Sequence, residues 1–256
     1  MSLLLALVLS ARPPAAVEPA PGDTARPWRW QGGIAYGAEV FRRDRSAWQT
    51  WVGSLGYRFP RVTLLVDLQA TSRFDQWDQA LGTEAYFSAS HRWSGYALAQ
   101  VAPGAGVLPR SDLTAALDRG IGDGWELGAS YRRMAFATAT IDIAGIEVNK
   151  YHRDWYFQVR GSLVPKSERT GFAGSVRARR AFGSAGDLVE FSLAGGEEVV
   201  LLGPSIAPDV RGTASASARL QQELGPRWGL SLGVTWNREA RVPDRYGVAL
   251  GLQLRW

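Results

Sequence analysis

The strongest constraint on the fold of this chain is a two-residue alternation of its side chains. The alternation is clearest in the last segment, where apolar residues are separated by small or polar ones: Tyr246, Val248, Leu250, Leu252, Leu254 and Trp256. Successive side chains of a β-strand point to opposite faces, so this segment has one apolar face and one small or polar face. The same alternation recurs from Trp28 onward, without apolar stripes of helical period. The sequence therefore predicts an all-β fold.

The alternating segments divide the chain into about fourteen strands within one domain. We expect them at residues 28–41, 47–59, 61–73, 81–92, 94–102, 110–119, 124–136, 139–148, 152–163, 170–182, 187–195, 209–223, 226–238 and 244–256. The alternation is weakest in 94–102 and 139–148, so about twelve strands is the alternative.

The links between these segments alternate in length. Short turns are expected at 59–61, 92–95, 120–124, 183–187 and 224–227, and longer links at 42–47, 74–80, 103–110, 165–170, 196–209 and 239–244. Short turns at one end and longer loops at the other are typical of outer-membrane barrels. We therefore predict a transmembrane, antiparallel, up-and-down β-barrel in the cell outer membrane, with a soluble β-sandwich binding module as an alternative.

Aromatic residues gather at both ends of the expected strands, as they do in the girdles of membrane barrels. At the short-turn end they are Trp28, Phe59, Trp93, Trp125, Phe182, Trp228 and Trp256, and toward the long-loop end Phe41, Trp51, Phe74, Phe136, Trp236 and Tyr246.

The face opposite the apolar one carries charges at mid-strand, which predicts a wet or ion-paired interior. The candidates for lumen-facing residues are Arg58, Arg132, Arg160, Arg177, Arg179, Arg211, Arg219, Arg255, Asp67, Asp112, Asp118, Glu126 and Glu190. An arginine-lined lumen would favour anionic solutes. The alternative is that these groups join neighbouring strands and fill a narrow lumen. The net charge of +5 does not predict a nucleic-acid partner, because the arginines are scattered singly.

The first residues have the composition of an export signal. Met1 to Leu9 are mostly apolar and are followed by a segment rich in alanine and proline. Such a run suits a secretory signal and is too short to span a bilayer as a helix. We expect a signal peptide at 1–20, a short segment at 21–27 and the barrel at 28–256.

Residues for catalysis or metal binding are scarce, because the chain has no cysteine and two histidines. His91 follows Ser90, and His152 lies near Asp154, but neighbouring residues in a strand face opposite ways, which disfavours a Ser–His pair. The carboxylate pairs Asp75/Asp78 and Glu197/Glu198 lack the further ligands that Ca²⁺ needs. We predict no catalytic residues, no metal and no cofactor, with an outer-membrane lipid hydrolase or deacylase using a Ser/His site as the alternative function.

The segment from Tyr246 to Trp256 resembles the C-terminal signal read by the barrel-assembly machinery, with Trp in place of the usual final Phe. The chain also resembles the YaiO-type outer-membrane barrel family over about residues 30–256. The likeness lies in residues 56–59, 73–75, 108–113, 127–133 with Phe136, and 151–156. It implies a non-enzymatic envelope protein, either a narrow pore or a structural barrel, embedded in outer-membrane lipid. The loose link of that family with exopolysaccharide systems suggests passage of a polysaccharide or an anionic solute.

Overall fold

The computed structural model describes residues 29–256 apart from 43–45, 166–169, 184–185, 201–208 and 241. The expected signal peptide at 1–20 and the segment at 21–27 lie outside the described residues. The strands are β1 (Trp30–Phe41), β2 (Trp48–Arg58), β3 (Val62–Arg73), β4 (Gln76–Ser88), β5 (Trp93–Val101), β6 (Ser111–Gly122), β7 (Trp125–Ala135), β8 (Thr140–His152), β9 (Trp155–Val164), β10 (Gly171–Ala181), β11 (Leu188–Val200), β12 (Asp209–Glu223), β13 (Trp228–Glu239) and β14 (Val242–Arg255).

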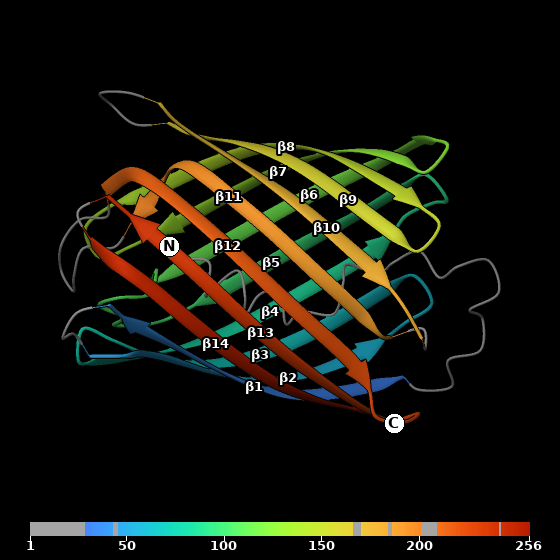
Figure 1. The fold of residues 1–256 in the computed structure, drawn as a ribbon, viewed down its shortest axis with the longest axis horizontal. Helices are drawn as coiled ribbons and strands as arrows, with labels where there is room; N and C mark the ends of the chain where they lie inside the picture. Colours follow the sequence, from blue (N-terminus) through green and yellow to red (C-terminus); the bar gives the residue numbers. More distant parts are fainter. Residues whose placement is uncertain (1–28, 43–45, 166–169, 184–185, 201–208, 241) are drawn as a thin grey trace.

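Each strand pairs antiparallel with its neighbours in sequence, and β1 pairs with β14 to close the sheet (Figure 1). The prediction of an all-β, up-and-down barrel of about fourteen strands is confirmed, and the alternative of twelve is wrong. Closure removes the sheet edges that would otherwise leave backbone groups unpaired. The described residues contain no helix that is long and apolar enough to cross a membrane.

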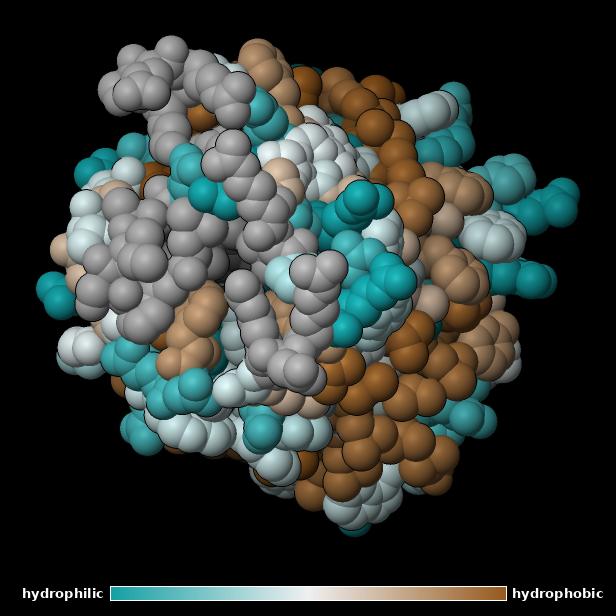
Figure 2. Space-filling view, turned by 60° about the vertical axis from the view of Figure 1, so that its left-hand side comes forward, coloured by the Kyte–Doolittle hydropathy of each residue, from teal (hydrophilic) through white to brown (hydrophobic). Residues whose placement is uncertain are grey.

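The two faces of the wall have opposite chemistry. On β14 the side chains of Val248 and Leu250 are 56% and 53% exposed, whereas Arg245 and Arg255, on the other face, are 1% and 6% exposed. The same contrast between an exposed apolar face and a buried polar face recurs around the ring. The apolar residues therefore form an outer belt, seen as brown surface in Figure 2. A soluble protein rarely exposes so large an apolar surface, whereas lipid covers it in a membrane barrel.

Two of the predicted long links are short turns. The link expected at 74–80 is a two-residue turn at Phe74 and Asp75, both with positive φ, and Arg73 pairs directly with Gln76. The link expected at 239–244 is equally short, since Glu239 pairs with Val242. Both errors have one cause: polar residues of an inward strand face resemble those of a loop. The expected contrast in loop length is therefore weaker than predicted.

The aromatic residues follow the prediction throughout the described short-turn end and in part at the other end, where Trp236 lies on the outer strand face; Trp28 lies outside the described residues. At the short-turn end, Phe59, Trp93, Trp125, Phe182, Trp228 and Trp256 are all exposed. At the other end Trp51 and Tyr246 are exposed. The ring centroids of Phe41 and Phe74, however, lie 5.0 and 5.1 Å from that of the buried Trp48. Phe136 packs against the buried cluster of Met134, Ile141 and Val164. Phe41 shares its strand face with Glu39, so the register turns it inward.

Candidate functional site in the barrel interior

The inner wall is the surface on which a barrel of this kind acts. Each of the charged residues named as lumen-facing shares its strand face with buried residues, opposite the apolar belt. They are Arg58, Asp67, Asp112, Asp118, Glu126, Arg132, Arg160, Arg177, Arg179, Glu190, Arg211, Arg219 and Arg255. The structure brings several of them together across neighbouring strands.

One of these contacts joins β6 to β7. Arg132 Nε donates to Asp112 Oδ1 at 2.9 Å, and its Nη2 forms a second bond to Oδ2. The Asp112 side chain is 1% exposed and that of Arg132 is 22% exposed. Because a bidentate guanidinium satisfies both carboxylate oxygens, it can hold a charge that burial would otherwise penalise.

A second cluster lies on β10 and β11, where two arginines share one carboxylate. Arg179 Nε and Nη2 donate to Glu190 Oε2 at 2.9 and 2.7 Å, and Arg177 Nε is 3.8 Å from Oε1. Arg219 on β12 is the register partner of Glu190 and donates to Gln221 Oε1 at 2.9 Å. Three guanidinium groups thus surround a single carboxylate, which leaves this part of the wall positively charged.

The inner wall also holds charged residues that were not predicted to face the lumen: Glu39, Arg73, Glu84, Glu147, Glu223, Glu239, Arg245 and Asp78, which was expected in a loop. Strand parity was the signal that could have found them. Glu84 alternates with Leu81 and Thr83 within an expected strand, but the outer face of that strand is only partly apolar. The remaining residues lie close to expected strand ends, where the register was least certain.

One loop packs against the inside of the barrel. Asp78 is buried on the inward face of β4, and its carboxylate accepts backbone N–H bonds from Gly106 (3.2 Å), Val107 (2.6 Å) and Leu108 (2.7 Å). The loop residues Ala102, Ala105 and Leu108 pack with Ala80, which shares the inward face of β4. The β5–β6 connection, residues 102–110, is therefore held against the inner wall near the long-loop end.

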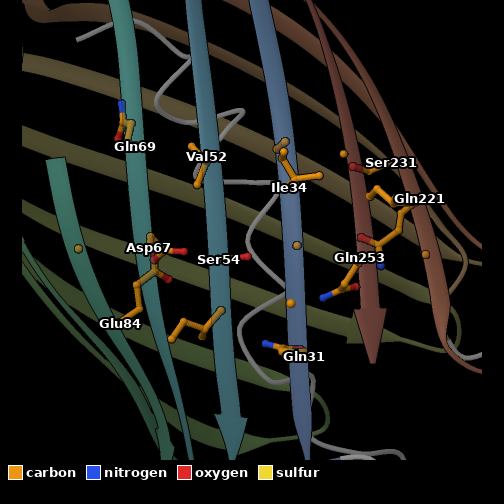
Figure 3. Close-up of a pocket in the computed structure, with 18 of the residues that line it drawn as sticks. Gln31, Ile34, Val52, Ser54, Asp67, Gln69, Glu84, Gln221, Ser231 and Gln253 are labelled. Carbon is orange, nitrogen blue, oxygen red and sulfur yellow. The ribbon is translucent and has the colours of Figure 1, made fainter. Parts of the chain in front are cut away.

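A cavity occupies the interior between β1–β5 and β12–β14 (Figure 3). Its charged lining comes from Asp67 on β3, Glu84 on β4 and Arg219 on β12. The rest of its polar lining is neutral: Gln31, Ser54, Gln69, Gln100, Gln221, Ser231 and Gln253. Polar groups of both signs therefore meet the same enclosed space.

The histidines lie away from this interior. His91 and His152 are exposed at the short-turn end, and no hydrogen bond joins either imidazole to a serine in the described part of the chain. Ser88 Oγ donates to the Ser90 carbonyl and Ser90 Oγ accepts from the Arg92 N–H. Within the described residues no His, Cys, Asp and Glu side chains group to hold a metal ion. Of the acidic pairs, Asp78 is occupied by backbone N–H groups, and the Glu198 side chain lies outside the described part of the structure.

Comparison with known proteins assigns this architecture to a family. Residues 30–198 match the YaiO membrane beta barrel domain. The chain belongs to the YaiO membrane β-barrel family. The match ends within β11, so it covers less of this YaiO barrel than the resemblance expected over 30–256. Two of the segments that carried the resemblance meet in the interior, because 108–113 includes Asp112 and 127–133 includes Arg132.

Solved structures share the fold of this YaiO barrel at low identity. They include the CymD monoaromatic hydrocarbon channel (TM-score 0.60, 8% identity, covering 90% of this chain and 89% of that one). The Acinetobacter baumannii outer membrane protein Omp33 has a TM-score of 0.54 and 11% identity, over 90% of this chain and 99% of that one. A bacterial polysaccharide outer membrane secretin has a TM-score of 0.51 and 8% identity, over 89% and 98%. No curated protein matches the sequence. The protein is an outer-membrane β-barrel.

Proposed function

We propose that this YaiO barrel is a narrow, non-enzymatic channel for small polar solutes. The observation that carries the proposal is the interior cavity along β12–β14 and β1–β5, where amides, hydroxyls and three charged groups line the space together with apolar side chains such as Leu65 and Leu98 (Figure 3). A barrel that served only as a structural element could fill its interior with interlocking side chains. A cavity lined by hydrogen-bonding groups instead offers a hydrated solute replacements for part of its water shell.

The loop at residues 102–110 supports a narrow channel. Its packing on Ala80 and its hydrogen bonds to Asp78 hold the loop against the inner face of the wall near the long-loop end. An inward loop of this kind reduces the cross-section that a solute meets, so we propose passage of small solutes. Passage of a polysaccharide stays a prediction from the family resemblance.

The balance of inner charges supports weak charge selectivity. Arginines suggested an anion-preferring lumen, but the inner wall also carries Glu39, Glu84, Glu147 and Glu223, which the sequence analysis did not weigh. Ion pairs such as Arg132–Asp112 further neutralise the arginines locally. Rings of one sign are what give a pore strong selectivity, and the described wall mixes both signs.

The test is the conductance of the detergent-refolded full chain in a planar lipid bilayer between two KCl solutions of different concentration. We expect small discrete steps and a reversal potential close to that of a weakly selective pore. Neutralising Arg177 and Arg179 to Gln should move the reversal potential toward cation preference, because Glu190 then loses its partners. A barrel that migrates as folded in unheated gels yet gives no steps would contradict the proposal.

A further inference from the structure

The charges that face the interior cavity are separated by sign across its width. Of the charged groups that line it, Asp67 and Glu84 lie on β3 and β4, whereas Arg219 lies on β12. Arg177 and Arg179 on β10 lie behind Arg219, where they pair with Glu190. In a closed ring of fourteen strands taken in sequence order, β3 and β4 stand opposite β10 and β11. Arg219, on the next strand β12, therefore lies across the interior from the two carboxylates.

The cavity meets both walls at once. Asp67, Glu84 and Arg219 all line it, and Figure 3 shows Asp67 and Glu84 on one side of the space with Gln221, next to Arg219 on the same strand face, on the other. Glu84 is 4% exposed and Arg219 is 8% exposed, so protein surrounds each group on all sides except the cavity. Charges in such a partly desolvated setting are screened less than charges on an open surface.

Between these two poles, the residues that line the cavity on one side are neutral. Gln31, Ser54, Ser231 and Gln253 come from β1, β2, β13 and β14 and line the same cavity without charge. On the other side, Glu147 pairs in register with Arg160, which reaches Ser130 Oγ at 2.8 Å, so charges of both signs lie close together there. On the first side, Arg255 donates to the lining residue Gln253 at 3.0 Å and also bonds to Glu223, so charges of both signs occur there as well. Neither flank therefore forms a pole of one sign.

We propose that the cavity selects small zwitterionic solutes, with the cationic group of the solute toward Asp67 and Glu84 and its anionic group toward Arg219. This inference rests on the proposed channel function and names its solute class. A zwitterion aligned in this way gains attraction at both ends, whereas a purely anionic or cationic solute meets one repelling wall. A neutral solute of equal size gains at neither wall.

The test compares two isomers of equal size, glycine, which is a zwitterion, and glycolamide, which is neutral. Swelling of liposomes that contain the refolded full chain measures the entry rate of each. We expect the ratio of glycine to glycolamide rates to exceed the ratio of the two diffusion coefficients by about threefold, because aligned charges raise the local concentration of the solute.

Two variants remove one pole each: Asp67→Asn with Glu84→Gln, and Arg219→Gln. Each should return the ratio of rates toward that of free diffusion, and the reversal potential in KCl should shift toward anions for the first variant and toward cations for the second. The matched control is Asp142→Asn, because Asp142 lies on the outer face of β8 and pairs with Arg133. It should leave both readouts unchanged.

The outcomes separate the two proposals. Entry of both isomers without a preference for glycine, or a preference that survives both variants, overturns zwitterion selection while the channel stands. Entry of neither isomer into liposomes that hold folded protein overturns the channel itself, and zwitterion selection with it.

Discussion

Glu39 on β1 and Arg245 on β14 form an ion pair across the seam that closes the barrel. Arg245 Nε lies 3.5 Å from Glu39 Oε2, and the two side chains are 1% and 0% exposed. Arg245 also bonds to Glu239 and lies over the ring of Trp48, with 4.7 Å to its centroid. Asn237 Nδ2 donates to Glu39 Oε1 at 2.9 Å. The first and last strands are thus joined by side chains as well as by their ladder.

We expect Arg245→Met to destabilise the folded barrel by about 3 kcal/mol, because it removes a buried guanidinium that pairs with both Glu39 and Glu239. The measurement is the urea midpoint for unfolding in lipid vesicles. Arg238→Met is the control, since Arg238 is 69% exposed and 3.9 Å from Asp244. An exposed pair of this kind contributes less than about 1 kcal/mol. Equal midpoints for the two variants would contradict the importance of the seam pair.

Asp78 holds the loop at residues 102–110 against the inner wall. We expect Asp78→Ala to free this loop, since three backbone N–H groups lose their acceptor. The single-channel conductance should then rise by about twofold, because the loop no longer narrows the lumen. Asp75→Asn in the adjacent turn is the matched control, because Asn tolerates the positive φ of that position. Identical current traces for wild type and Asp78→Ala would show that the loop does not narrow the channel.

The Asp112–Arg132 pair lends itself to a double-mutant cycle. Arg132→Met should lower the free energy of unfolding by about 3 kcal/mol, because the carboxylate of Asp112 is 1% exposed and loses its bidentate partner. Adding Asp112→Leu should restore much of that loss, since the buried charge disappears with its partner. Urea unfolding of the four proteins gives the coupling energy. Strictly additive losses would show that the pair is not a unit.

Gly124 is one of few positions where glycine is required. Its φ is +72°, and a Cβ there would collide with the carbonyl oxygen of Tyr151, whose N–H bonds to the Gly124 carbonyl at 2.7 Å. We expect Gly124→Ala to reduce the fraction of protein that refolds, read from heat-modifiable gel migration, because the β7 and β8 ends must separate. Gly53→Ala is the control, since a Cβ at that position would have no other atom within 4 Å.

The sequence predicted the strands well where the outer face was strongly apolar. β14 and β7 were expected within two residues of their observed starts and ends, because apolar or aromatic residues recur at alternate positions through most of each strand. β4 was expected five residues late, since Gln76 and Asp78 are polar inward residues that resemble a loop. An interior that is polar removes the contrast between strand and loop on which such predictions depend.

The interior was predictable as a face but not as a set of contacts. Parity alone put Asp112 and Arg132 on the same side of the wall, but their bidentate pairing depends on the register between β6 and β7. The same holds for Asp78, whose partners are backbone groups about thirty residues away in sequence. Short-range pattern carries no information on which distant N–H groups will meet a carboxylate.

The sequence by itself determined that this chain forms a closed, membrane-embedded sheet, because a two-residue period with an apolar outer face is satisfied only when lipid covers that face and every strand edge is paired. Only the tertiary structure decided the chemistry inside. Ring closure set β3 and β4 opposite β10 and β11, and so placed Asp67 and Glu84 across the cavity from Arg219. Which residues face one another across a barrel depends on strand number and register, and these are properties of the whole ring.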